Sequence, residues 1–166
     1  MGNEMSTKSK TRKWAQLGGK KLVYLLDQIE NKLVPIVEAA GYERINHYFG
    51  VPDHKVSASR MHFQRAANTG FDAITFAFDK YHRPKFQVEL TRAQLGLDFE
   101  WDQKANLLKR NCHWFHFFGK PFWFPARFWT DRMADRAVDQ VRVRLPSALQ
   151  FLDTGERGQA VSKAIG

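Results

Sequence analysis

The chain has 166 residues, 43% apolar and 14% aromatic, which is long and apolar enough to bury a core as one folded domain. Its single cysteine, Cys112, excludes an internal disulfide framework, and no run of residues approaches the roughly 18 apolar positions of a membrane span. We therefore expect a cytoplasmic protein.

The formal net charge of +9 is unevenly distributed along the chain. Six basic side chains lie within residues 1–21, where Glu4 is the one acidic residue. We interpret residues 1–19 as a basic, flexible tail and residues 20–166 as a single α+β domain. A basic tail can attract phosphate backbones or anionic membranes, and it can also be merely solvated.

Residues 20–40 carry apolar side chains at helical spacing, which predicts a first helix. Gly41 follows at the position where a glycine commonly ends a helix. Pro35 lies inside the pattern, so we expect a kink or a break into two helices near Val34.

The middle of the chain predicts antiparallel strands. The strongest signal is a hairpin in which residues 71–78 pair with residues 85–91 across a turn cluster that begins at Asp79. The aromatic residues around Gly119 predict one or two strands more. The other expected segments are a strand over 42–51, a polar loop over 52–59, a strand over 61–65 and a strand over 95–101.

After Phe128 the pattern becomes helical again. Pro146 ends one expected helix, Gly155 ends the next, and residues 156–165 predict a short last helix. The expected fold is thus α+β, an antiparallel β-meander of about five strands with an N-terminal helix and C-terminal helices packed on the sheet. Exposed ion pairs are expected between Arg132 and Asp135, Arg136 and Asp139, and Asp139 and Arg142.

Nine of the twenty residues from 111 to 130 are aromatic. If Trp114, His116 and Phe118 share one face of a strand, Phe115 and Phe117 share the other, so both faces carry rings. One face then belongs to the core, and a helix, a partner or a second copy in a homodimer covers the other. The binding residues predicted from this pattern are Trp114, His116, Phe118, Trp123, Arg127 and Trp129.

Three segments resemble a family of small bacterial α+β proteins of unknown function: AAGYERI at the end of the first helix, the strand FQVEL, and LPSALQFLDTG near the C-terminus. The resemblance covers most of residues 20–160. Relatives with this layout often occur in toxin-immunity or mobile-element contexts, so the resemblance implies an immunity-type interaction protein. It assigns no functional residues.

Catalytic and metal-binding patterns are weak in this sequence. Cys112, His113 and His116 are types of residue that bind zinc, but His113 and His116 point to opposite faces of a strand and a second cysteine is absent. A buried free thiol is the ordinary state of such a cysteine. We predict no catalytic residue, no metal site and no cofactor.

A divergent metal-dependent nuclease is one alternative. Asp72 or Asp79 could hold Mg²⁺ together with Glu89, but Thr91 stands where that chemistry needs a lysine. The remaining residues of this hypothesis are Lys85 or Arg92 as the cation and Glu30 or Glu38 as a further ligand. The competing interpretation places Asp79 at the start of the turn and Glu89 on the solvent face.

A nucleic-acid-binding accessory protein is the other alternative. Basic residues surround the aromatic segment, and cations interleaved with rings favour single-stranded nucleic acid. These residues are Lys104, Lys109, Arg110, Lys120, Arg127, Arg132 and Arg136. The leading prediction is a non-enzymatic interaction module that binds a protein or a small apolar ligand through its aromatic-rich face, with no membrane contact.

Overall fold

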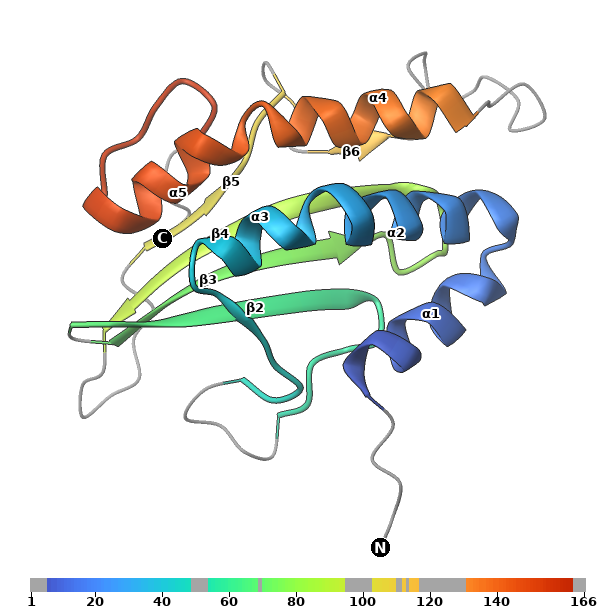
Figure 1. The fold of residues 1–166 in the computed structure, drawn as a ribbon, viewed down its shortest axis with the longest axis horizontal. Coiled ribbons are helices and arrows are strands. Elements are labelled where there is room, and N and C mark those ends of the chain that lie inside the picture. Colours follow the sequence, from blue (N-terminus) through green and yellow to red (C-terminus); the bar gives the residue numbers. More distant parts are fainter. Residues whose placement is uncertain are drawn as a thin grey trace, which may run out of the picture.

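The computed structural model describes residues 6–48, 54–68, 70–94, 103–109, 112, 114–116 and 131–162. As predicted, it is an α+β fold in which helices cover an antiparallel sheet (Figure 1). The elements in chain order are α1 (Thr7–Leu17), α2 (Lys20–Lys32), α3 (Val34–Ala39), β1 (Glu43–Arg44), β2 (Arg60–Ala67), β3 (Gly70–Phe78), β4 (Lys85–Gln94), β5 (Gln103–Asn106), β6 (Phe115–His116), α4 (Asp131–Arg142) and α5 (Leu145–Thr154).

The sheet is a meander in the order β1-β2-β3-β4-β5, and β6 pairs with β4 beyond the end of β5. The predicted hairpin is confirmed: β3 and β4 pair antiparallel from Phe78–Phe86 to Gly70–Gln94. Because side chains alternate along a strand, this register puts the large apolar residues of neighbouring strands in line on one face. One such row contains Phe63, Ile74 and Leu90.

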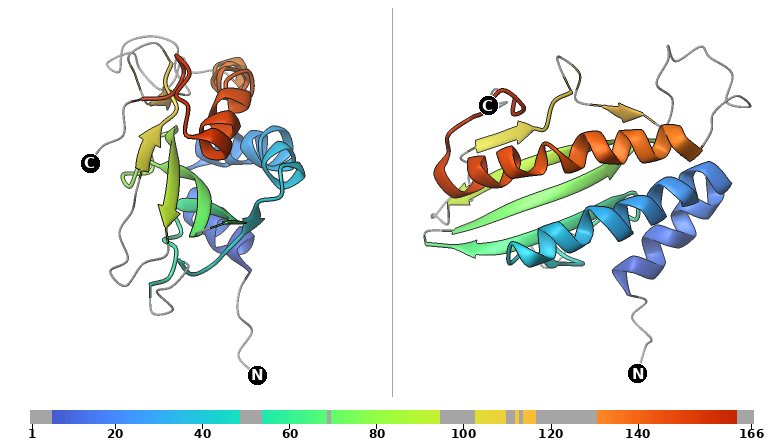
Figure 2. Two further views of the ribbon diagram at one scale, coloured as in Figure 1. Left: turned by 90° about the vertical axis from the view of Figure 1, so that its left-hand side faces the viewer. Right: turned by 45° about the horizontal axis from the view of Figure 1, so that its top comes forward.

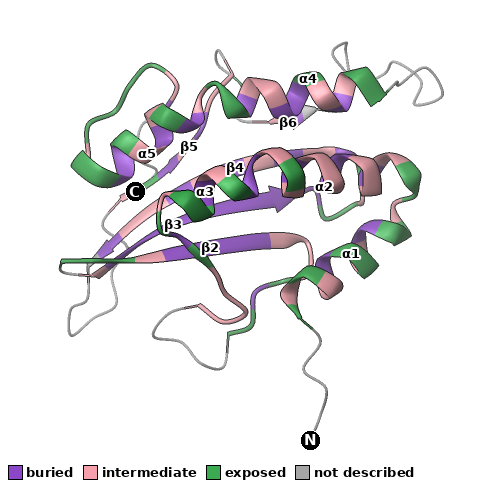
Figure 3. Ribbon diagram, in the orientation of Figure 1, coloured by how far each residue is buried: buried purple, intermediate pink, exposed green. Residues whose placement is uncertain are grey.

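That apolar face of the sheet packs against two helical rods, α2–α3 and α4–α5, which lie side by side (Figure 2). The buried positions of the helices face inward toward the sheet (Figure 3). Leu22, Leu25 and Ile29 of α2 and Val138 and Val141 of α4 belong to the same buried cluster as the sheet residues. One continuous core therefore fixes both the sheet and the helix layer.

Two of the expected helix boundaries in the helical rods are present. The first helix breaks at Leu33, two residues before Pro35, which occupies the first turn of α3 where its missing N–H is not needed. Gly155 ends α5 in the left-handed conformation, with φ at +76°, and its N–H donates to the carbonyl of Phe151.

The prediction of a flexible tail over residues 1–19 is wrong for Thr7–Leu17, which form α1. Ser6 caps the helix by accepting a hydrogen bond from the N–H of Ser9. Thr11 and Ala15 are buried, and Trp14 packs against the main core. The composition of this segment is mostly polar, but Thr11, Trp14 and Ala15 form a short, largely buried side of the helix. Trp14 packs on Phe78, which is distant in sequence.

Two other expectations differ from the structure. The first strand is limited to Glu43–Arg44, because the following residues leave the edge of the sheet after Ile45 donates to the carbonyl of His62. Residues 156–162 contain no helix; instead Val161 forms a β-bridge with Leu107, and the carbonyl of Ala160 accepts from Leu108. This segment lies along the outer edge of β5. The strand expected over 95–101 lies outside the described residues.

Candidate functional site

The predicted binding residues are only partly covered by the structure. Trp114 directly precedes β6, and His116 lies in β6 opposite Lys85 of β4. The Lys85 Nζ atom lies 4.2 Å from the ring centroid of Trp114, a cation–π contact. The other four residues, Phe118, Trp123, Arg127 and Trp129, lie outside the described part of the chain, as do Arg110 and Lys120. The aromatic binding face therefore stays a prediction, as does the homodimer.

The contact of Lys85 with Trp114 connects β6 to the β3–β4 turn, residues 79–85. This turn packs against α1 on its other side. The Trp14 ring stacks on His82, with centroids 4.6 Å apart and planes 23° apart, and it also contacts Phe78 at 5.8 Å. A Cβ atom at Gly18, after the end of α1, would approach within 3.0 Å of His82. The helix and the turn are thus packed as one unit.

Asp79 organises the turn from within. Its carboxylate is buried and accepts a hydrogen bond from the N–H of Tyr81. Its Oδ2 atom lies 2.8 Å from Arg83 Nε and 3.9 Å from Lys85 Nζ. His82 is in the left-handed region, with φ at +59°, which non-glycine residues adopt at an energetic cost. The His82 N–H donates to the Asp79 carbonyl and its ring stacks on Trp14, so both its backbone and its side chain are engaged.

Tyr81 projects from the turn with 64% of its surface exposed. Lys80 Nζ lies 5.0 Å and the Arg83 guanidinium carbon 5.3 Å from its ring centroid. An exposed cation–π contact contributes only about 0.5–1 kcal/mol, so Lys80 can leave the ring for another partner at little cost. The turn therefore presents one exposed ring with two cations close to it.

The α1 region and the turn together define what we call the basic surface, residues 6–21 and 79–85. Residues 6–21 carry six basic and no acidic side chains, and residues 79–85 carry three basic and one acidic, so the two segments hold +8 of the formal net charge of +9. Figure 1 shows α1 at the end of the molecule opposite the C-terminal end of α5. The contact between the two segments thus brings an excess of positive charge together, although Arg12 is paired with Asp27 of α2.

The three strand and turn carboxylates of the nuclease hypothesis, Asp72, Asp79 and Glu89, are each paired with a guanidinium group, and Glu30 is paired with Arg44. Both oxygens of Glu89 accept from Arg60, at 2.7 and 2.8 Å, and Asp79 is held within the turn. Asp72 is paired with Arg65 at 3.1 Å, although burial still raises the pKa of Asp72. Among the residues that the structure describes, no three histidine, cysteine, aspartate or glutamate side chains gather where a metal ion could bind.

A row of polar side chains lies on the sheet face opposite the helices and is centred on His62. The His62 ring is buried, with its Nδ1 atom 2.6 Å from Thr75 Oγ1 and its Nε2 atom 3.0 Å from the amide nitrogen of Gln64. Burial, with a smaller contribution from Arg60, lowers the pKa of His62 to about 4. Because both ring nitrogens are engaged, this neutral imidazole is a structural group and lacks a free position for substrate.

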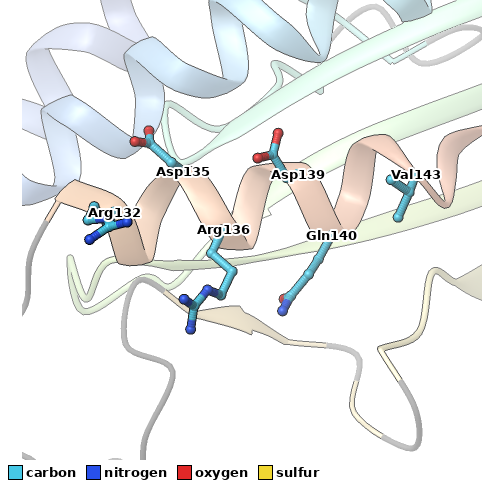
Figure 4. Close-up of a pocket in the computed structure, with 6 residues that line it drawn as sticks. All are labelled: Arg132, Asp135, Arg136, Asp139, Gln140 and Val143. Atoms are coloured by element: carbon cyan, nitrogen blue, oxygen red, sulfur yellow. The ribbon is translucent and has the colours of Figure 1, made fainter.

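One side of α4 borders an open hollow of about 450 Å³, lined by Arg132, Asp135, Arg136, Asp139, Gln140 and Val143 (Figure 4). Its two arginines and two aspartates leave it without net charge. Of the expected ion pairs, Arg142–Asp139 is present at 3.3 Å. Asp135 accepts a hydrogen bond from Tyr24 of α2, so that carboxylate joins the two helical rods.

Cys112 is exposed, which corrects the expectation of a buried thiol. Its backbone forms an antiparallel bridge with that of Lys109. Within the described ranges, no helix combines the length and apolarity needed to cross a membrane.

The chain matched no family model, no curated protein and no solved structure in the three comparisons made.

Sequence reasoning missed the basic surface because it assigned the basic residues to a tail. A signal was available in Thr11, Trp14 and Ala15, whose spacing of three and four residues matches one side of a helix. Ser6 before that stripe is a favourable helix cap. The contact between Trp14 and His82 joins segments far apart in sequence, and periodicity carries no information about it.

Proposed function

We propose that the protein binds nucleic acid through the basic surface. The observation that carries this proposal is the packing of α1 on the β3–β4 turn, which brings together two segments that hold +8 of the formal net charge. Nucleic acid carries closely spaced phosphates, and neutralising them releases bound counterions. Charges held on a folded surface engage neighbouring phosphates with less loss of conformational entropy than charges on a disordered tail.

The polarity of the side chains on the solvent side of α1 favours nucleic acid over a membrane as the ligand. A helix that binds a membrane inserts an exposed apolar side between the lipid headgroups. In α1 the residues suited to that role, Trp14 and Ala15, face the protein. Leu17, at the C-terminal end of α1, is its one strongly exposed large apolar residue. The solvent side is otherwise polar and basic, with Lys8, Arg12 and Lys13 exposed.

The proposal is tested by fluorescence anisotropy with a labelled oligonucleotide of about 15 nucleotides, titrated at several salt concentrations from about 50 mM upward. The test variant is Lys8→Gln/Lys10→Gln, which removes two charges from α1. The matched control is Arg142→Gln/Arg157→Gln, which removes two exposed charges from residues outside the basic surface.

Each phosphate contact contributes about 0.7 to the slope of log affinity against log salt for a single strand. The α1 variant should therefore reduce the slope by about 1.4 and the control should leave it unchanged. Absence of oligonucleotide binding by the wild type at about 50 mM salt would overturn the proposal. Equal losses in both variants would also contradict it, because only net charge would then matter. Tighter binding to anionic vesicles than to oligonucleotide would assign the surface to membranes.

A further inference from the structure

We propose that the basic surface selects nucleic acid with unpaired bases, and that Tyr81 is the ring on which such a base stacks. This inference rests on the proposed function and adds the class of ligand. An aromatic side chain contributes to single-strand binding by stacking on a base, whereas bases in a duplex are already stacked inside the helix. A surface made of cations alone would have no such preference.

The exposure of Tyr81 is the first support. The residue is 64% exposed within the β3–β4 turn, although large apolar groups of the described residues are otherwise mostly buried. Nothing in the core requires a ring at that position. An exposed ring beside cations is the combination that single-strand-binding surfaces use.

The second support is the arrangement of cations around that ring. Lys80 Nζ and the Arg83 guanidinium carbon lie 5.0 and 5.3 Å from the Tyr81 centroid. A base that takes one face of the ring displaces a flexible cation, and the displaced cation then lies close to the phosphates on either side of that base. Binding thus exchanges one weak, exposed cation–π contact for a base stacked on Tyr81 and a cation that contacts phosphate.

The third support is that the turn is held in place before any ligand binds. The N–H of Tyr81 donates to Asp79 Oδ1, and the next residue, His82, stacks on Trp14 of α1. A ring on a fixed turn loses less conformational entropy when a base stacks on it. The same contact joins the turn that carries the ring to α1, whose exposed side is basic, so we expect one strand to contact both segments.

The test compares single-stranded oligothymidine of about 15 nucleotides with a duplex of equal length, by anisotropy at one salt concentration. The variants are Tyr81→Ala, which removes the ring, and Tyr81→Phe, which keeps it. Because Tyr81 is exposed, neither substitution disturbs the core.

Tyr81→Ala should weaken single-strand binding about 5- to 150-fold, and Tyr81→Phe should leave it within about 2-fold of the wild type. Duplex binding should be the same in all three proteins. If the wild type binds both ligands and Tyr81→Ala weakens neither, the inference about Tyr81 is wrong while the proposed function stands. If the wild type binds neither ligand, the proposed function itself fails.

Discussion

The packing of α1 on the β3–β4 turn can be tested by the substitution Trp14→Ala. The Trp14 ring is half-buried, stacks on His82 and contacts Phe78. Each aromatic contact contributes about 0.5–1.5 kcal/mol beyond the burial of area, and burying about half of an indole contributes about 2 kcal/mol. Removing the ring should destabilise the docked state of α1 by about 3–5 kcal/mol.

Amide hydrogen exchange measures this local stability directly. In the wild type, the α1 amides that donate within the helix should be protected. In Trp14→Ala their protection should fall about 140- to 4,000-fold, while the amides of β3 and β4 exchange as before. Leu17→Ala, at a side chain that is 78% exposed, is the control and should change little. Unprotected α1 amides in the wild type would refute the reasoning, because residues 7–17 would then be a tail.

Two further predictions concern the rest of the fold. The pKa of His62 is lowered to about 4 from 6.5, so the unfolded chain takes up a proton first as the pH falls, and up to about 3 kcal/mol of stability should be lost between pH 6.5 and 4. Urea denaturation should show that the free energy of unfolding falls less over this pH range in His62→Gln than in the wild type. The same pH dependence in the variant and the wild type would contradict the lowered pKa of His62. In Gly155→Ala, the alanine would have to keep φ at +76°, a strained conformation for a residue with a Cβ atom, so the melting temperature should fall by about 2–8 °C. Gly158→Ala, where a Cβ meets only Ser147 at 3.7 Å, should leave the melting temperature nearly unchanged. Equal decreases in the two variants would contradict a specific requirement for glycine at position 155.

The sheet and the helical rods could be predicted from the sequence because their signals are local. Alternation over residues 71–78 and 85–91 defined the hairpin, Pro35 defined the break between α2 and α3, and Gly155 defined the end of α5. Each depends on backbone geometry that a single residue type or a short repeat controls. The antiparallel meander could be predicted because the expected strands follow one another along the chain with short connections.

The basic surface could not be predicted in the same way, because it depends on a contact between distant segments. Residues 7–17 are rich in lysine, serine and threonine, a composition typical of a solvated tail. Their helix is stabilised where Trp14 meets His82, and no pattern in either segment indicates the other. The exposure of Cys112 was not predicted for a related reason. The burial of a given residue depends on tertiary packing, and its residue type indicates only how often such residues are buried on average.

The central claim is that α1 and the β3–β4 turn form one nucleic-acid-binding surface. The most direct measurement is the set of ¹H–¹⁵N chemical-shift changes that unlabelled oligothymidine causes in the ¹⁵N-labelled protein. We expect the largest changes in residues 6–21 and 79–85, with the two segments following the same binding curve and so the same dissociation constant. Changes centred on α4 and α5, or no changes at low salt, would contradict it.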